Sequence, residues 1–112
     1  MAQPLDFTCA YSTTATLAAG VAAEIDVPIN GASDWTIVLR NTGGSNTVTA
    51  LTIAVSPLGT LFGAAASITT GIPLAASTSL AEIVGSNEPC ATARLTVTST
   101  AGTTISIEAG GR

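Results

Sequence analysis

Apolar and polar residues alternate along the chain from residue 16 onward, which is the pattern of β-strands with one buried face. The alternation is clearest in residues 21–29, 35–39, 49–55, 95–97 and 105–107, and residues typical of turns occupy the intervals. It predicts an all-β domain. The residues that it directs toward a core are Ile25, Val27, Trp35, Ile37, Leu39, Leu51, Ile53, Val55, Leu95, Val97, Ile105 and Ile107.

Two glycine-containing turns predict β-hairpins. Residues 42–46 separate the strand that contains Trp35 from the strand that ends before Pro57. Residues 100–103 separate the last two strands in the same way. Each pair of strands is therefore expected to lie side by side in one sheet.

The first of these hairpins begins with a strongly apolar strand, residues 35–39. Exposed sheet edges are normally protected by lysine, proline or inward-pointing charge. Here only Asp34 and Arg40 flank the strand, and the chain has no lysine. We expect the face of Trp35 to be covered by an opposing sheet, and the unguarded edge of the strand to be where a neighbouring subunit binds.

A weak internal repeat runs through the strand pattern. Leu-Ala-Ala-Gly at residues 17–20 recurs as Leu-Ala-Ala-Ser at 74–77, and Ala-Glu-Ile at 23–25 recurs at 81–83. At the same offset, the apolar positions of residues 37–39 fall on Leu95 and Val97. The repeat indicates a duplication, although the matching residues are common types and chance similarity is the alternative.

Each copy, over residues 17–56 and 74–109, is expected to supply one strand and one hairpin. Two such three-stranded units facing each other would form a single antiparallel β-sandwich, immunoglobulin-like or jelly-roll-like, of about six to eight strands. We expect this domain to span residues 16–109 and to follow an irregular N-terminal arm over residues 1–15.

Composition excludes several classes of partner. Hydrophobic residues make up 46% of the 112 residues, charged residues only 9%, and the net charge is −4. Such a chain has no basic patch for nucleic acid. It also has no unbroken apolar stretch of about 20 residues to span a membrane. The N-terminus lacks the features of a secretory signal, so if Met1 is native we expect synthesis in the cytoplasm.

Catalytic chemistry is poorly represented. The chain has no histidine and no lysine, which excludes Ser-His-Asp and Cys-His catalysis, histidine-containing zinc sites and Schiff-base chemistry. Glu24 and Glu82 form the one formal acid pair, and solvated surface charge is the better interpretation. Asp26, Asn30, Ser33 and Asp34 could hold calcium, but turn chemistry alone explains these residues and is the favoured interpretation. We expect no enzyme activity, no cofactor and no metal.

Two cysteines, Cys9 and Cys90, leave two alternatives. A disulfide would close a long loop and stabilise the fold by about 4 to 5 kcal/mol in the chain-entropy model. In a cytosolic chain, two buried free thiols are the simpler interpretation.

Aromatic, apolar and arginine side chains supply the candidate contacts. Trp35 lies in phase with the core positions, so a core role is favoured over a sugar-stacking platform. Two segments fall outside the repeat, the N-terminal arm and the connector over residues 57–73, and both carry large apolar residues. The interface candidates are Leu5, Phe7, Tyr11, Leu61, Phe62, Arg40 and Arg94. For the two arginines an ordinary salt bridge is the alternative.

Low charge and high alanine content indicate that part of the surface is buried against other subunits. We therefore expect a homo-oligomer or a lattice-bound subunit. The segments at residues 17–28 and 35–44 resemble the small structural proteins of tailed bacteriophages, notably capsid decoration (cement) and head-fibre proteins. Residues 39–44 also resemble CARDB-type immunoglobulin-like modules of bacterial surface proteins. Either resemblance covers about residues 16 to 109.

The phage resemblance implies a non-enzymatic virion protein. It would form trimers or other small oligomers on the capsid exterior, bind the major capsid protein, and stabilise the head by bridging capsid subunits. The arm and the connector would then supply the apolar anchors. The alternative is a cell-surface or carbohydrate-binding immunoglobulin-like β module.

Overall fold

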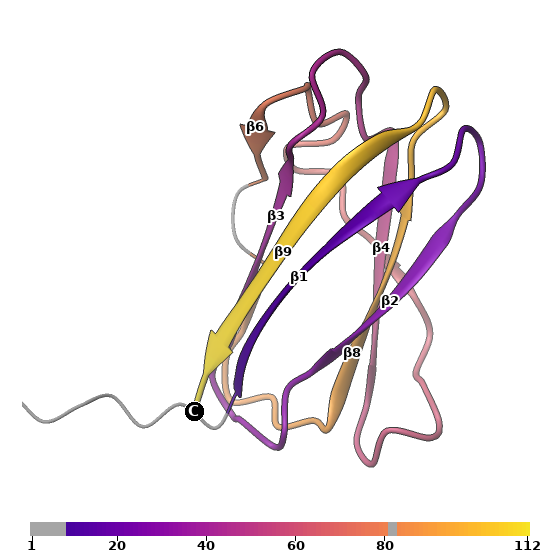
Figure 1. The fold of residues 1–112 in the computed structure, drawn as a ribbon. Helices are drawn as coiled ribbons and strands as arrows, with labels where there is room; N and C mark the ends of the chain where they lie inside the picture. The colour runs from indigo at the N-terminus through magenta and orange to yellow at the C-terminus, as the bar shows by residue number, and fades with distance from the viewer. Residues whose placement is uncertain (1–8, 81–82) are drawn as a thin grey trace, which may run out of the picture.

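In a computed structural model that describes residues 9–80 and 83–112, the chain forms two antiparallel sheets packed face to face. Sheet A has the strand order β1-β9-β3-β6, with β7 also paired to β3, and sheet B has the order β2-β8-β4-β5. Figure 1 shows β1, β9 and β3 side by side in one layer. The strands of sheet A are β1 (Cys9–Leu17), β3 (Trp35–Asn41), β6 (Thr78–Ser79), β7 (Ile83–Gly85) and β9 (Thr103–Gly111). Those of sheet B are β2 (Ala23–Pro28), β4 (Ala50–Ser56), β5 (Ala66–Ser67) and β8 (Thr92–Thr98).

The described residues contain nine strands and no helix, so the predicted all-β sandwich is confirmed. The strand number exceeds the expected six to eight because β5, β6 and β7 are only two or three residues long. Such short strands show too few alternating positions to be recognised in a sequence.

The core lies between the sheets, where their alternating apolar faces meet. Of the predicted core residues, three are only partly buried: Ile25, Ile53 and Val55. The others are buried: Val27, Trp35, Ile37, Leu39, Leu51, Leu95, Val97, Ile105 and Ile107. The core also contains residues that the pattern did not single out: Cys9, Leu17, Ile29, Ala32, Val48, Leu74, Leu80, Cys90, Ala93 and Ala109.

Both predicted hairpins are wrong. β3 pairs with β9 in sheet A, whereas β4 pairs with β8 in sheet B. The chain therefore crosses between the sheets at residues 42–49 and again at residues 99–102. The alternation could not reveal this, because two strands that face one core from opposite sheets show the same pattern as two neighbours in one sheet.

A buried asparagine holds these crossings together. The side-chain nitrogen of Asn41 donates to the carbonyl oxygens of Asn46, at 2.7 Å, and Leu74, at 3.0 Å. Its side-chain oxygen accepts from the Thr103 hydroxyl, at 2.8 Å, and from the Gly43 amide, at 3.1 Å. Asn41 is completely buried, so these four bonds satisfy a side chain that would otherwise destabilise the core.

The strand expected to carry the unguarded edge is central. β3 lies between β9 on one side and β6 and β7 on the other, so the prediction that a subunit binds its edge is wrong. The apolar character of residues 35–39 instead reflects burial inside the sheet, with Trp35, Ile37 and Leu39 facing the core.

The prediction of an irregular N-terminal arm over residues 1–15 is wrong for residues 9–15. These residues belong to β1, which pairs along its whole length with β9. Its inward positions are Cys9, Tyr11, Thr13, Ala15 and Leu17, most of them small or polar enough to weaken the alternation. Leu5 and Phe7 lie outside the described residues.

Strand pairing relates the two halves of the chain. Ile25 of β2 is opposite Leu95 of β8, and Ile83 of β7 is opposite Ile37 of β3. The sequence repeat equates Ile25 with Ile83 and Ile37 with Leu95, so the two pairings are equivalent. Each sheet nevertheless contains strands from both halves, which contradicts the expectation of one sheet per copy. The correspondence supports an internal duplication, which we retain as a proposal.

Trp35 occupies a slot between two glycines. Its register partners in the neighbouring strands are Gly85 of β7 and Gly111 of β9. A Cβ atom at Gly85 would overlap the indole ring, and one at Gly111 would overlap the Trp35 backbone. The indole nitrogen donates to the Glu88 carbonyl oxygen at 3.0 Å, so the ring is both packed and hydrogen-bonded.

Enlarging the slot-forming glycine tests this packing. We expect Gly85→Ala to lower the free energy of unfolding by about 1 to 3 kcal/mol, because the added methyl must displace the indole ring. Urea denaturation followed by Trp35 fluorescence measures it. Gly44→Ala is the matched control, since nothing lies within 4 Å of a Cβ there. Equal stability of the two variants would contradict the packing described for Trp35.

Candidate functional site

The outer face of sheet A is nearly free of charge. The outward residues of its three long strands are Ala10, Ser12, Thr14, Thr16, Thr36, Val38, Arg40, Thr104, Ser106, Glu108 and Gly110. Only Arg40 and Glu108 among them are charged, and most of the others are small. Small side chains project only a short way from the sheet, so larger groups of a partner can approach the backbone closely.

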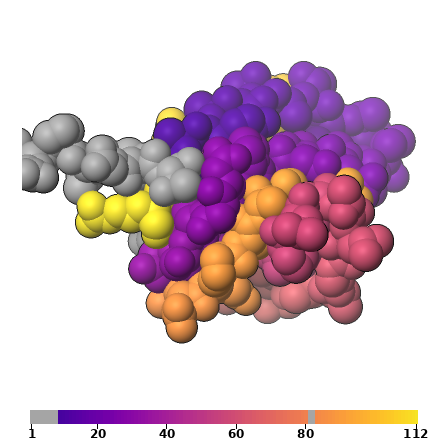
Figure 2. All heavy atoms as spheres, turned by 90° about the horizontal axis from the view of Figure 1, so that it is seen from below, coloured from indigo at the N-terminus to yellow at the C-terminus, as the bar shows by residue number. Residues whose placement is uncertain are grey.

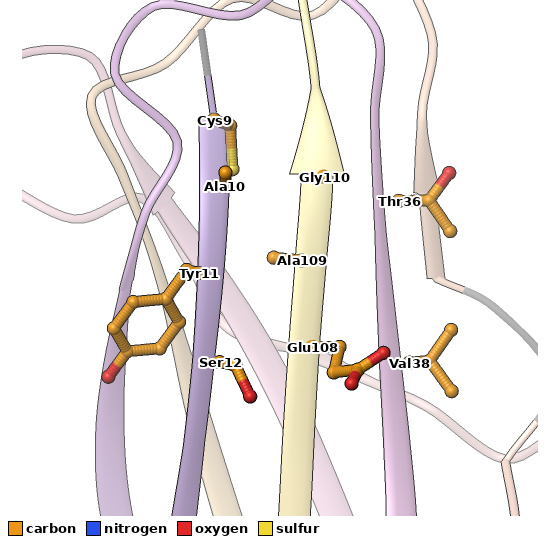
Figure 3. Close-up of a pocket in the computed structure, with 9 residues that line it drawn as sticks. All are labelled: Cys9, Ala10, Tyr11, Ser12, Thr36, Val38, Glu108, Ala109 and Gly110. Atoms are coloured by element: carbon orange, nitrogen blue, oxygen red, sulfur yellow. The ribbon is translucent and has the colours of Figure 1, made fainter. Parts of the chain in front are cut away.

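This face is hollowed at the end where β1 begins. The hollow has a volume of about 720 Å³ and is lined by residues 9–12, Thr36, Val38 and residues 108–110. Figure 3 shows the Glu108 side chain extending from β9 toward Val38 of β3. We call this depression the outer hollow. It presents one carboxylate and a few hydroxyls among mostly apolar atoms.

A second depression continues the outer hollow across the sheet. It has a volume of about 320 Å³, shares Val38 and Glu108 with the outer hollow, and adds Arg40, Thr42, Ser79 and Ser106. Glu108 thus stands between the two depressions. Together they form a shallow surface suited to contact with another molecule, with hydrogen-bonding groups but without an enclosed reaction chamber.

The outer face of sheet B carries a charged cluster instead. The Arg94 guanidinium binds the Asp26 carboxylate through two contacts, Nε to Oδ1 at 2.7 Å and Nη2 to Oδ2 at 3.1 Å. The Glu24 carboxylate oxygen Oε2 lies 3.7 Å from Nη1 of Arg94. The Phe62 ring packs against the guanidinium, with the ring centroid 4.0 Å from Cζ of Arg94. These contacts bring two of the interface candidates, Phe62 and Arg94, into one cluster.

Electrostatics in this cluster favour the charged forms of both partners. The hydrogen bond from Arg94 lowers the pKa of Asp26 below its ordinary value, and the same bond raises the pKa of Arg94. The sequence analysis left an interface role or an ordinary salt bridge open for Arg94, and the structure contains the salt bridge. Arg94 also holds the connector against sheet B through Phe62.

The remaining interface candidates are dispersed. Leu61 is 80% exposed on the connector, and Tyr11 lines the outer hollow while packing partly against the core. Arg40 is exposed on the outer face of sheet A. Leu58, one of the large apolar residues that made the connector a candidate contact segment, is 85% exposed. The sequence analysis missed Val84, which is 61% exposed. The sequence could have indicated an exposed residue here, because successive side chains of a strand point to opposite faces and one of Ile83 and Val84 must therefore face outward.

Glu108 was also missed. It follows Ile107 and precedes Ala109, both buried, so the alternation already placed it outward. An acid on a sheet face with few other charges is a better candidate for binding than an acid within a charged cluster. Its position in the outer hollow depends on β1 and β3 lying beside β9, and that pairing could not be read from the sequence.

Cys9 and Cys90 are buried free thiols. Burial raises the pKa of both, and for Cys90 the charges of Glu88 and Cys9 add to the effect. The Cys9 thiol donates to the Pro28 carbonyl oxygen at 3.2 Å. Thiols with raised pKa are poor nucleophiles at neutral pH, so these two act as core side chains.

The candidate carboxylate sites are not assembled as metal sites in the part of the chain described. Asp26 is bound to Arg94, and the Asp34 carboxylate accepts a hydrogen bond from the backbone amide of Asn87 at 2.9 Å. No group of three or more Cys, Asp or Glu side chains in residues 9–80 and 83–112 is arranged to hold a metal ion. Glu82, the proposed partner of Glu24, lies outside the described residues. Within the same residues no helix is long and apolar enough to cross a membrane.

One end of the sandwich is closed by three loops that lie together in Figure 2, the violet, rose and orange segments. The amides of Ile29 and Gly31 donate to the carbonyl oxygens of Ala91 and Cys90, and the Ala91 amide donates to Ser56. This network ties the loops to one another. The exposed Leu58 and Leu61 project from the connector, which contributes one of these loops.

Comparison with known proteins identifies the fold. No family model matches the chain, and a search of curated proteins finds no match. Among solved structures it is similar to chitosan-binding module 1 of a chitosanase/glucanase from Paenibacillus sp. IK-5, with a TM-score of 0.54 and 17% identity over 88% of this chain and 76% of that chain. A chain in the structure of infectious bursal disease virus Gx strain aligns at a TM-score of 0.42 and 18% identity, over 95% of this chain and 29% of that chain. At these identities the first likeness shows a shared β-sandwich fold, and the second is too weak to support an argument.

The Asp26–Arg94 pair predicts a pH dependence of stability. Because the pKa of Asp26 is lowered in the fold, the pair stabilises the protein above the unfolded-state pKa, about 3.9, and the stabilisation is lost as the pH falls through the folded-state pKa. We expect Asp26→Asn to be less stable than wild type at about pH 7, and the gap to close at about pH 2. The gap will be small, since both side chains are partly exposed.

Urea titrations of both proteins at the two pH values measure this gap. Glu88→Gln serves as the control for loss of an exposed acid outside the cluster. A gap of the same size at both pH values would contradict the ionic origin assigned to the Asp26–Arg94 contact.

Proposed function

We propose that this chain is a non-enzymatic virion structural protein, a capsid decoration protein that binds the outside of a phage head. The observation that carries the proposal is the nearly uncharged outer face of β1, β9 and β3 in sheet A, where only Arg40 and Glu108 of the described outward residues bear charge. A large neutral face made of small residues favours lasting contact with another protein over free exposure.

Exposed apolar side chains elsewhere support the same function. Leu58 and Leu61 project from the connector at 85% and 80% exposure, and Val84 is 61% exposed at the rim of sheet A. Each offers a small apolar contact. A protein that bridges several subunits gains stability by adding such modest contacts through multivalency, without a single deep pocket.

The proposed partners are further copies of this chain, with a trimer favoured by the phage resemblance, and a major capsid protein. Stabilisation of the head would be mechanical, because each bound copy links neighbouring capsid subunits against internal pressure. Nucleic acid is not a proposed partner, since three arginines against seven acids leave no basic surface.

Particle composition tests the proposal. We expect mass spectrometry of purified particles of the encoding virus to find this chain at about one copy per major capsid subunit, as repeated bridging contacts require. We expect Leu58→Ser with Leu61→Ser to lower that copy number, because apolar contact area is lost. Ala65→Ser, on the same connector, is the matched control. Absence of the chain from the particles would refute the proposal.

A second function is favoured by a specific observation, the fold likeness to a chitosan-binding module over 88% of this chain. Chitosan is a cationic polymer of amino sugars, and this chain has a net charge of −4. The Glu108 side chain and the hydroxyl-bearing residues Ser12 and Thr36 line the same outer hollow. A hollow that presents a carboxylate and hydroxyls suits an ammonium-bearing sugar.

Titration with chitosan oligosaccharides, followed by calorimetry, tests this second function. We expect binding to weaken about tenfold in Glu108→Gln, because one charge-assisted hydrogen bond is lost. Glu88→Gln, at the loop end of the sandwich, is the control and should bind normally. Uncharged chitin oligosaccharides should bind less tightly. No binding of chitosan by the wild type would exclude this function.

A further inference from the structure

The four sheet edges of the sandwich differ in length. β1 ends sheet A and β2 ends sheet B, and they lie on the same side of the molecule, where the Cys9 thiol reaches the Pro28 carbonyl oxygen. On the opposite side, β5, β6 and β7 are only two or three residues long. Short strands offer few unpaired backbone groups, so among the edges formed by the described strands β1 and β2 are the two that are long enough to pair with another chain.

The two long edges also differ in protection. β2 carries the exposed acids Glu24 and Asp26 and ends in Pro28. β1 is nine residues long, with the sequence Cys-Ala-Tyr-Ser-Thr-Thr-Ala-Thr-Leu, and contains no charge and no proline. Charge and proline are the usual devices that prevent strand addition. β1 is therefore the one long edge in the described structure that lacks them.

Backbone geometry identifies the free groups of β1. Asp34 and Arg112 exchange backbone hydrogen bonds at 3.1 and 2.9 Å, so even-numbered residues of β9 bond to β3. The odd-numbered residues of β9 then bond to the odd-numbered residues of β1. The amides and carbonyls that turn away from β9 belong to the exposed residues Ala10, Ser12, Thr14 and Thr16.

These backbone amides and carbonyls have few hydrogen-bond partners in the described part of the chain. Among the described residues β1 pairs in a ladder only with β9. The Thr14 carbonyl oxygen receives a contact from the neighbouring Thr13 hydroxyl at 3.5 Å, the long limit for a hydrogen bond. An extended strand laid along β1 would complete a regular ladder at these positions.

We propose that β1 pairs antiparallel with β1 of a second copy across a two-fold axis, joining the two A sheets into one. An uncharged strand can oppose itself without repulsion, whereas two β2 edges would set Glu24 and Asp26 against the same acids. The hydroxyl-bearing residues Ser12, Thr14 and Thr16 become cross-strand neighbours, an arrangement that threonine favours.

This contact can be tested separately from the proposed virion and sugar-binding functions. It uses the backbone edge of β1, while those functions use the connector and the outer face of sheet A, where Ser12 of β1 lines the outer hollow. It predicts a dimer as the basic unit in place of the trimer that the phage resemblance favours, since a trimer closed by a heterologous contact would leave β1 free. A wild-type protein that does not dimerise could therefore still be found in particles, and a protein absent from particles could still dimerise.

Light scattering on the intact protein tests the proposal. We expect the wild type to show twice the chain mass of 11.0 kDa at high micromolar concentration. Thr14→Pro removes an amide that faces the free edge without breaking a bond to β9, and Thr14→Lys sets two charges against each other. Both variants are expected to halve the mass. Thr70→Lys, at an exposed turn, is the matched control and should remain dimeric.

Hydrogen exchange adds a readout specific to β1. We expect the amides of Ser12, Thr14 and Thr16 to exchange about tenfold more slowly in concentrated than in dilute solution, because pairing protects them. Thermal unfolding confirms that the variants are folded, and if Thr14→Pro is not, Thr14→Lys decides. A monomeric or trimeric wild type, a dimer that survives Thr14→Lys, or exchange at these amides that does not depend on concentration would each overturn the proposal.

Discussion

The fully bonded side chain of Asn41 is the interaction on which the two-layer arrangement depends. It lies at the end of β3, where the chain leaves sheet A, and binds the crossing loop, the segment before β6 and the start of β9. The Ser99 hydroxyl, also buried, donates to the Thr47 carbonyl oxygen at 2.6 Å and joins the second crossing to the first. Without these bonds the crossings would bury unpaired polar groups, and each such group would destabilise the fold.

The positions at which the chain crosses between the sheets determine which strands are neighbours, and thereby how charge is distributed over the surface. β2 and β8 become neighbours, so Asp26 and Glu24 meet Arg94, and the connector covers that site with Phe62. β1, β9 and β3 become neighbours in the other sheet, and their outward residues are mostly small and neutral. The two outer faces therefore differ: one is charged and partly covered by its own chain, and the other is neutral and open. Apart from Leu58 and Leu61 on the connector, the proposed contacts use the neutral sheet.

Sequence reasoning located parts of the candidate surface but could not assemble them. The exposure of Leu61 and the salt-bridge alternative for Arg94 agree with the structure, because each depends on local character. The packing of Phe62 against Arg94 and the place of Glu108 in the outer hollow depend on which strands are neighbours. The unguarded edge was assigned to residues 35–39, the most apolar strand. Apolar character instead marks a central strand, and the free edge is the weakly patterned β1.

By itself, the sequence determined the all-β class, nine of the nineteen buried hydrophobic residues in the described part of the chain and the small number of catalytic groups. These follow from the alternation of side chains along single strands and from the residue types present, which are local properties. Only the tertiary structure decided which strands share a sheet, that residues 9–15 form a strand, and which edge and face remain open. Strand pairing is settled by contacts between distant residues, such as those of Asn41 with Leu74 and Thr103. A period of two along a strand is the same whichever sheet the strand joins.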